Sequence, residues 1–180
     1  MRAMEHDSEL FDEEDGNVEN TYLTFHVEGE EYAVSVAHVT EIVRLQKMFA
    51  MPDVPEYIRG VINLRGKVIP LLDVRARFGL PEAPYTDRTV IVVLELEETI
   101  TGLVVDGVSE VAEIAAGDIE PVSSSKTRIR KSMVKGMAKR ASGVSFVLDV
   151  SALLAVERGP EPTRSEGAAT LLGHEGRGER

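Results

Sequence analysis

The chain of 180 residues contains no cysteine and no tryptophan, and aromatic residues make up only 5% of it. Without cysteine it has no disulfide framework, thiol nucleophile or cysteine-bound metal. It has no apolar run near the roughly 18 residues that a membrane-spanning helix needs, and no basic-then-apolar amino terminus. We therefore expect a soluble, cytoplasmic protein that is neither exported nor inserted in a membrane.

The motifs of the common enzyme classes are also missing. The chain has no GxSxG turn, phosphate-binding loop or HExxH motif. His6 and His174 lie in the polar ends, and His26 and His38 have no neighbouring acid at metal-ligand spacing. Asp73 follows an apolar strand, where capping a short helix at 74–78 is favoured over acid–base chemistry. We expect no enzymatic activity, no metal and no cofactor.

The net charge of -11 is distributed unevenly. Residues 1–20 hold eight acidic residues and one basic residue, whereas residues 21–156 are nearly balanced. We expect 1–20 to be a flexible acidic tail and the Gly-, Glu- and Arg-rich segment 157–180 to be a second flexible tail. A net acidic chain is a poor candidate for binding nucleic acid.

Between the tails, short apolar and alternating segments separated by turn residues predict mostly β-strands. A first hairpin is expected at 22–35, further strands at 90–94, 101–105 and 108–114, and a strand pair at 134–138 and 144–148. Val36, Val39, Ile42 and Val43 recur at helical spacing and predict a short helix, and 150–156 predicts a closing helix. Prolines at 81 and 84 divide the strands into groups at about 21–85 and 86–156. This favours two small barrels in one unit, or a sandwich, although no repeat between the halves is evident.

The most informative segment is the hairpin predicted at 59–73. Two apolar runs flank the turn Asn63-Leu64-Arg65-Gly66, in which Gly66 is free to adopt a positive φ. An arginine on a rigid turn loses little entropy on binding and can contact a carboxylate through two hydrogen bonds. Arg65 is therefore either a binding residue or a solvated turn residue, and Glu41 is a possible partner for it.

Seven basic residues without an intervening acid form a second candidate: Lys126, Arg128, Arg130, Lys131, Lys135, Lys139 and Arg140. This run is either a docking patch for an acidic partner or a solvated loop that offsets the acidic tail. Nucleic acid is a weaker alternative because no aromatic residues are interleaved with the bases.

Several segments, in this order, closely resemble the CheW family of chemotaxis coupling proteins. They are YLTF at 22–25, GEEY at 29–32, VTEI at 39–42, YIRGVINLRG at 57–66, VIPLLDVR at 68–75 and GLVVDGVSEV at 102–111. The resemblance runs from about residue 21 to 155. It implies an all-β fold with short helices, in which two SH3-like five-stranded barrels form one CheW-like domain over 21–156.

The resemblance also implies a non-catalytic adaptor that couples chemoreceptors (methyl-accepting chemotaxis proteins) to the histidine kinase CheA. The receptor's cytoplasmic hairpin tip would bind a groove that contains Val39, Glu41, Arg65, Val108 and Val111. The three valines have core burial as an alternative. Tyr57 and Gly60 would lie near the surface that binds the CheA regulatory domain. Glu120 and Ser125 stand where some members carry a basic and an aromatic residue for a second kinase contact.

Other functions are less compatible with the sequence. The CheW-like domain also occurs in CheA and CheV, and we expect a free-standing adaptor because the chain has no room for their additional domains. A β-barrel that binds a small molecule would need convergent polar residues in its apolar core runs. An enzyme would need a nucleophile–base arrangement. Association with the membrane would be only indirect, through receptors.

Overall fold

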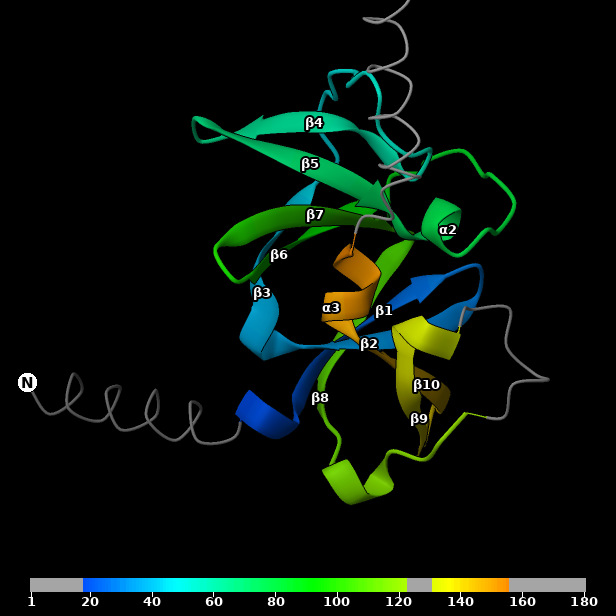
Figure 1. Cartoon of the computed structure of the whole chain (residues 1–180). Helices are drawn as coiled ribbons and strands as arrows, with labels where there is room; N and C mark the ends of the chain where they lie inside the picture. Colours follow the sequence, from blue (N-terminus) through cyan, green and yellow to red (C-terminus); the bar gives the residue numbers. More distant parts are fainter. Residues whose placement is uncertain (1–17, 123–130, 156–180) are drawn as a thin grey trace, which may run out of the picture.

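A computed structural model describes residues 18–122 and 131–155 of the chain. Within these residues, ten strands form two five-stranded sheets, and the two α-helices are short. One sheet lies above the other in Figure 1, and the short helix α3 (Val150–Leu154) lies between them. The predicted all-β class with two five-stranded units and short helices is confirmed. The segments 1–17, 123–130 and 156–180, which include most of both predicted tails and part of the basic run, lie outside the described residues.

Sheet 1 has the strand order β8-β1-β2-β10-β9. The hairpin β1 (Thr21–Val27) and β2 (Glu30–Ser35) confirms the first predicted hairpin. β8 (Gly107–Glu113) pairs with β1, and β10 (Gly143–Leu148) lies parallel to β2 and antiparallel to β9 (Val134–Arg140). The pairing of β9 with β10 was also predicted from the sequence.

Sheet 2 has the order β3-β6-β7-β5-β4. β4 (Ile58–Leu64) and β5 (Lys67–Asp73) form the predicted central hairpin, and β6 (Val90–Leu96) pairs with β7 (Thr99–Val105). β5 runs parallel to β7, and β3 (Val39–Arg44) pairs with β6. The pairing directions match those of sheet 1 strand for strand, so the two sheets have the same topology.

Each sheet takes strands from both sides of the proline-containing connection at 81–84. Sheet 1 combines β1 and β2 with β8, β9 and β10, whereas sheet 2 is formed by β3 to β7. The predicted groups 21–85 and 86–156 do contain five strands each. However, the first group contributes its opening hairpin to the sheet completed by the second, so the two sheets do not coincide with these ranges.

The helix predicted over residues 36–43 is wrong. Val36–His38 form a single 3₁₀ turn, η2, and Val39–Arg44 form the edge strand β3. The burial of β3 alternates between half-buried and exposed side chains, which is the period of a strand. Apolar residues spaced three and four apart fit a helix, but pairing with β6 satisfies the backbone of this segment instead.

Three clusters of buried residues form the core. The largest joins the sheets and includes Leu23, Phe25, Tyr32, Leu72, Val92 and Leu103. Ile62, Leu71 and Val93 belong to a cluster within sheet 2, and Tyr22, Ala33 and Val147 belong to one within sheet 1. Central strands are therefore buried on both faces, which explains the continuous apolar run at 90–94.

The short helices follow β5 and β10 in the same way. α2 (Val74–Arg77) begins after Asp73, whose carboxylate accepts a hydrogen bond from the Ala76 N–H at 3.3 Å. α3 (Val150–Leu154) begins after Asp149, which accepts from the Ala152 N–H at 3.1 Å. Both caps satisfy an otherwise unpaired N–H of the first turn. The capping role predicted for Asp73 is thus confirmed.

Each sheet curls so that its two edge strands approach, but the pairing is not that of a closed barrel. An isolated bridge joins Phe49, beyond β3, to Val61 of β4, and another joins Glu120, beyond β8, to Met137 of β9. Glycine permits each close approach. A Cβ on Gly60 would lie 2.5 Å from the Phe49 carbonyl oxygen, and one on Gly136 would lie 2.5 Å from the Glu120 carbonyl oxygen.

Candidate functional site

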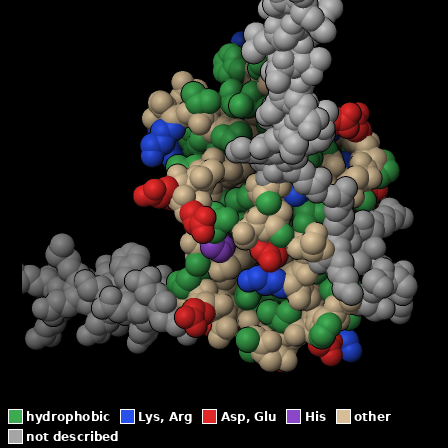
Figure 2. All heavy atoms as spheres, viewed as in Figure 1, with side chains coloured by type: hydrophobic (Ala, Val, Ile, Leu, Met, Phe, Trp, Pro, Cys, Tyr) green, Lys and Arg blue, Asp and Glu red, His purple; other side chains and the backbone are tan. Residues whose placement is uncertain are grey.

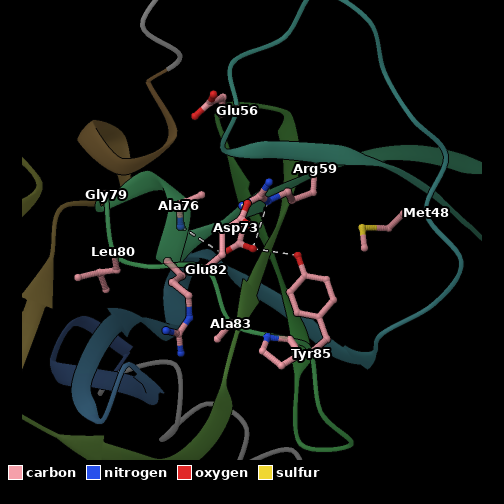
Figure 3. Close-up of a pocket in the computed structure, with 12 residues that line it drawn as sticks. Met48, Glu56, Arg59, Asp73, Ala76, Gly79, Leu80, Glu82, Ala83 and Tyr85 are labelled. Atoms are coloured by element: carbon pink, nitrogen blue, oxygen red, sulfur yellow. Dashed lines mark hydrogen bonds and ion pairs between the residues drawn. The ribbon is translucent and has the colours of Figure 1, made fainter.

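A polar cleft of about 810 Å³ lies where β5, α2 and the 82–85 loop meet. Figure 3 shows Asp73 at its centre, with Arg59 and Tyr85 directed toward the Asp73 carboxylate. The Tyr85 hydroxyl donates to Asp73 Oδ2 at 2.8 Å, and Arg59 Nε donates to the same oxygen at 3.4 Å. Because Asp73 also caps α2, its buried carboxylate holds three segments of chain together.

Hydrogen bonds and ion pairs within the protein already use four of the five charged residues that line this cleft, namely Arg59, Asp73, Arg75 and Glu82. Arg59 also pairs with Glu82, and Arg75 pairs with Glu28 and Asp106. Burial raises the pKa of the Tyr85 phenol well above its usual value, and the hydrogen bond to Asp73 and the negative charge of Asp73 add to this effect. A phenol with a raised pKa stays protonated near neutral pH and is a weak acid there, so the arrangement favours a structural role over proton transfer.

A second, more apolar hollow of about 490 Å³ lies between the 51–58 segment, the β6–β7 turn and the end of α3. Ile58, Leu72, Leu96 and Leu154 contribute to its lining. It has little polar surface with which to orient a ligand.

The predicted binding residues Val39, Glu41 and Arg65 belong to sheet 2. Val39 and Glu41 lie on β3 at one edge of the sheet, and Arg65 lies in the turn that joins β4 and β5 at the other edge. Arg65 Nη2 donates to Glu41 Oε2. The pairing considered from sequence is present because sheet 2 curls and brings its two edges together.

The geometry of the turn explains why Arg65 is presented to solvent. Leu64 pairs with Lys67, and the two residues between them have positive φ, 53° for Arg65 and 86° for Gly66. This is a two-residue hairpin turn whose twist matches that of the strands. The Gly66 N–H also donates to Asn63 Oδ1 at 2.9 Å. The Arg65 side chain is 67% exposed and its partner Glu41 is 30% exposed, so the carboxylate orients a cation that stays accessible.

The other two predicted binding residues, Val108 and Val111, lie on β8 of sheet 1. Val108 and Val39 are half-buried and pack against the core cluster that joins the sheets. The alternative of core burial therefore applies to them in part. Val111 is different, because it is 62% exposed and offers an apolar contact to solvent. We call Val39, Glu41, Arg65, Val108 and Val111 the edge-strand surface.

Tyr57 and Gly60, the residues expected near a kinase-binding surface, make internal contacts. The Tyr57 ring lies beneath the Arg77 guanidinium at 4.6 Å, and its carbonyl accepts a hydrogen bond from the Asp73 N–H at 2.7 Å. Gly60 is buried beneath the Phe49 backbone. The neighbouring Phe49, which bridges to Val61, is the exposed residue beside them, with 50% of its surface accessible to solvent.

The basic run is only partly described. Arg140 is not available for docking, because it pairs with Glu31 and Glu110. Lys135 and Lys139 are exposed. Charged side chains are scattered among hydrophobic ones on the described part of the face in Figure 2 and form no continuous basic surface there. Glu120 is exposed and bridges to Met137, whereas Ser125 lies outside the described residues.

Besides Glu41–Arg65, the structure contains a second ion pair that was not predicted from the sequence. It joins Glu110 on β8 to Arg140 at the end of β9. A signal was present, because VSEV at 108–111 repeats the pattern of VTEI at 39–42. Among the residues that the structure describes, no group of three or more His, Cys, Asp or Glu side chains could hold a metal ion. No helix in the same part of the chain is long and apolar enough to cross a membrane.

Comparison with known proteins gives a consistent result. Residues 21–158 match the family model for the CheW-like domain. The chain is 30% identical over 136 residues to the chemotaxis protein CheW of Klebsiella aerogenes, covering 76% of this chain and 82% of that protein. It is 34% identical over 132 residues to the chemotaxis protein CheW of Bacillus subtilis, covering 73% and 85%. The crystal structure of the scaffolding protein TtCheW from Thermoanaerobacter tengcongensis matches with a TM-score of 0.70 and 32% identity, over 77% of this chain and 89% of that one.

Proposed function

The chain belongs to the CheW family, and from this premise we propose that it is a non-catalytic adaptor that couples chemoreceptors to the histidine kinase CheA. The similarity to a protein described as a scaffold supports this role, and so does the length over which the family matches. The adaptor would work in the cytoplasm and would meet the membrane only through the receptors that it binds.

The observation that carries the proposal is the exposed Arg65, oriented by Glu41 on a rigid hairpin turn. An arginine held in this way binds with little loss of side-chain entropy. Exposed Val111 and half-buried Val39 and Val108 add apolar area on the edge strands. We infer that this edge-strand surface binds the helical hairpin tip of a receptor, with apolar contacts to the valines and hydrogen bonds from Arg65.

The kinase would bind elsewhere on the molecule. We retain Tyr57 and Gly60 as the predicted location, with exposed Phe49 as the side chain that makes the contact. Gly60 would act indirectly, because it allows the Phe49 backbone to lie against β4. A rigid two-sheet body with two separate surfaces suits an adaptor, since a change at one partner is transmitted through packed strands.

Binding of a small molecule is the second candidate, and the cleft around Asp73 is the place for it. The cleft is large enough for a ligand. Apart from Glu56, however, its charged side chains are engaged in ion pairs within the protein, and a ligand that bound them would have to displace these contacts. We therefore favour the adaptor, and we propose no enzymatic activity and no binding to nucleic acid.

The test is binding of the full-length protein to two purified probes: a CheA regulatory domain and a receptor hairpin-tip fragment, each taken from the same genome. Isothermal titration calorimetry would measure each probe alone and then each in the presence of the other. An adaptor binds both at once. Failure to bind either the tip fragment or the kinase domain would contradict the proposed function.

Arg65→Glu supplies the residue-level test. We expect it to weaken binding of the tip fragment at least tenfold, because it removes a cation and places two carboxylates together. Arg88→Glu is the matched control, since Arg88 is exposed and carries the same charge. The free energy of unfolding should change by less than about 1 kcal/mol for Arg65→Glu, as expected for an exposed ion pair. A loss of stability typical of a core substitution would show that Arg65 is structural instead.

A further inference from the structure

The described part of the chain ends at the rim of the apolar hollow between the 51–58 segment, the β6–β7 turn and α3. Leu154 at the end of α3 and Ala155, the last described residue, both line this hollow. Ile58 and Leu72 of sheet 2 lie in the same lining. Figure 1 shows the carboxyl end of α3 directed toward sheet 2. The chain beyond residue 155 therefore starts beside an apolar surface.

Arg77 of α2 fixes the place at which the chain leaves α3. Its Nε donates to the Leu153 carbonyl oxygen at 3.1 Å, and its Nη2 donates to those of Ala152 and Ala155 at 3.2 and 3.0 Å. The last carbonyl groups of a helix have no partner within the helix, and this side chain supplies one to three of them. Arg77 is buried, and its guanidinium stacks on the Tyr57 ring. The start of the carboxyl-terminal segment is thus held at the hollow.

The apolar hollow is large enough to take several side chains. Its volume is about 490 Å³, within the range of roughly 300–1,000 Å³ for sites that enclose most of a small ligand. Ile58, Leu96 and Leu154 are half-buried, and Met51 is 43% exposed, so apolar lining remains accessible to water. Covering this lining with an apolar segment of matching size is favourable.

The sequence beyond residue 155 supplies one such segment. Residues 157–180 contain five acidic and four basic residues, but 167–173 contain none of either. Leu171 and Leu172 are the only large apolar side chains in 157–180. Together with Ala168 they have the spacing i, i+3 and i+4, which places three side chains on one face of a helical turn. We call 168–172 the carboxyl-terminal apolar segment.

We propose that the carboxyl-terminal apolar segment docks into the apolar hollow of the same chain, with the side chains of Leu171 and Leu172 inserted. Ala168 follows Ala155 by 13 residues, and a coil of that length has an end-to-end distance of about 20 Å. The segment can therefore return to a hollow that begins at Ala155. A short tether also gives an effective concentration in the millimolar range, so an intrinsic Kd of about 1 mM is enough to populate the docked state.

The amino-terminal segment is a poorer occupant of the apolar hollow. It also carries large apolar residues, Leu10 and Phe11, but residues 1–20 hold eight acidic residues and one basic residue. Glu97 lies in the lining of the hollow, so like charge opposes the approach of this segment. The uncharged run at 167–173 avoids that repulsion.

Docking would place the carboxyl-terminal apolar segment beside the predicted kinase contact. Met51, which belongs to the lining of the hollow, lies two residues from the exposed Phe49. The docked segment would therefore cover apolar surface next to Phe49. The inference itself does not depend on the proposed function, because the contact forms within one chain.

The test measures how close residue 170 comes to the apolar hollow. The chain has no cysteine, so Thr170→Cys allows a nitroxide spin label to be attached at that position alone. Paramagnetic broadening of the backbone amides is then recorded by NMR on the isotope-labelled full-length protein. We expect strong broadening of the amides of Ile58, Leu96 and Thr99, whereas the amides of the β9–β10 turn in sheet 1 should keep their intensity.

A tethered segment also visits the hollow by diffusion, so variants must separate docking from proximity. Leu171→Asp/Leu172→Asp should lower the paramagnetic relaxation rate in the hollow about threefold or more, because a carboxylate resists burial in an apolar site. Thr163→Asp/Ser165→Asp adds the same two carboxylates without touching the leucines and should leave the rate nearly unchanged. Met51→Asp, at an exposed position of the lining, should lower the rate as well.

Two results would overturn the inference. The first is equal broadening in the original protein and in Leu171→Asp/Leu172→Asp, which would show that the tether alone brings the label near the hollow. The second is broadening in a mixture of isotope-labelled protein without the spin label and spin-labelled protein without the isotope, which would assign the hollow to a second copy. Thermal unfolding followed by circular dichroism checks that each variant keeps the fold. No receptor or kinase is present, so failure of the proposed function would leave this result unaffected.

Discussion

Replacing Gly60 by alanine should destabilise the protein strongly, because two separate requirements for glycine coincide there. Gly60 has a φ of +149°, a conformation that residues with a Cβ rarely adopt. The added Cβ would also lie 2.5 Å from the carbonyl oxygen of Phe49 and 3.2 Å from its carbonyl carbon. Both contacts are with backbone, so no side-chain rotation can relieve them.

The size of the stability loss follows from the backbone strain at residue 60 and from the hydrogen bonds that would be broken. Backbone strain of this kind costs about 1–3 kcal/mol. Displacing Phe49 would also break the two hydrogen bonds of its bridge to Val61, at 2.8 and 2.9 Å, each with a net contribution of about 1 kcal/mol. We therefore expect Gly60→Ala to lower the free energy of unfolding by about 3–5 kcal/mol, which corresponds to a fall in Tm of about 15 °C for a domain of this size.

Two other glycines separate the contributions. Gly29 has a φ of +78° and no atom within 4 Å of an added Cβ, so Gly29→Ala should cost only about 1 kcal/mol. Gly136 does not have a positive φ, but its Cβ would lie 2.5 Å from the Glu120 carbonyl oxygen, so Gly136→Ala should cost about 2–3 kcal/mol. Urea unfolding followed by circular dichroism measures all three. A Gly60→Ala variant as stable as Gly29→Ala would refute the reasoning.

Two further predictions concern the cleft around Asp73. Asp73→Ala should lower the free energy of unfolding by about 3 kcal/mol, since it removes a helix cap and the contacts to Arg59 and Tyr85, whereas Asp149→Ala should cost only about 1 kcal/mol, the usual value for a cap alone; equal losses in urea unfolding would show that the additional contacts contribute nothing. Because its pKa is raised, the Tyr85 hydroxyl stays protonated in the folded protein at a pH where it ionises in the unfolded chain. The contribution of this hydroxyl to stability is therefore complete below about pH 10 and is lost as the pH rises above that value. The free energy of unfolding should therefore fall less between pH 9 and pH 10.5 for Tyr85→Phe than for the unsubstituted protein. The same pH dependence in both proteins would contradict this assignment.

The matching topology of the two sheets bears on how the fold is stabilised. Leu72-Asp73-Val74 and Leu148-Asp149-Val150 end corresponding strands, and Gly60 and Gly136 open corresponding hairpins. The opening hairpin of each half completes the sheet of the other half. Arg77 at the end of α2 strengthens this junction, because it donates to the carbonyl oxygens of Leu153 and Ala155 at 3.1 and 3.0 Å. Unfolding of one half would therefore remove strands from both sheets, so we expect the domain to unfold as one cooperative unit.

Local chemistry explains why some elements were predictable. The β4–β5 hairpin follows from two apolar runs around a turn in which glycine takes a positive φ. The strand at 90–96 follows from a β-branched run that is buried on both faces. The cap at Asp73 follows from a carboxylate placed directly before a helix.

Where local chemistry is ambiguous, the sequence was misleading. The apolar spacing at 36–43 fits a helix as well as a strand, and the choice depends on whether β6 offers an open edge for pairing. The repeat between VTEI and VSEV is not evident from the sequence, because a match of only four residues carries little information. It becomes significant once the pairing of β8 with β1 and the pairing of β3 with β6 are seen to share the same register.

The sequence by itself determined that the chain is a β-rich member of the CheW family, that its hairpins form where they do, and that Arg65 lies on a turn. These properties depend on residues close together in the chain, on turn geometry and on alternating burial. Only the tertiary structure decided which hairpin completes which sheet, that Glu41 meets Arg65, and that Glu110 meets Arg140. Alternation specifies which face of a strand is buried but not which strand lies beside it, and that choice is made by packing between segments far apart in the sequence.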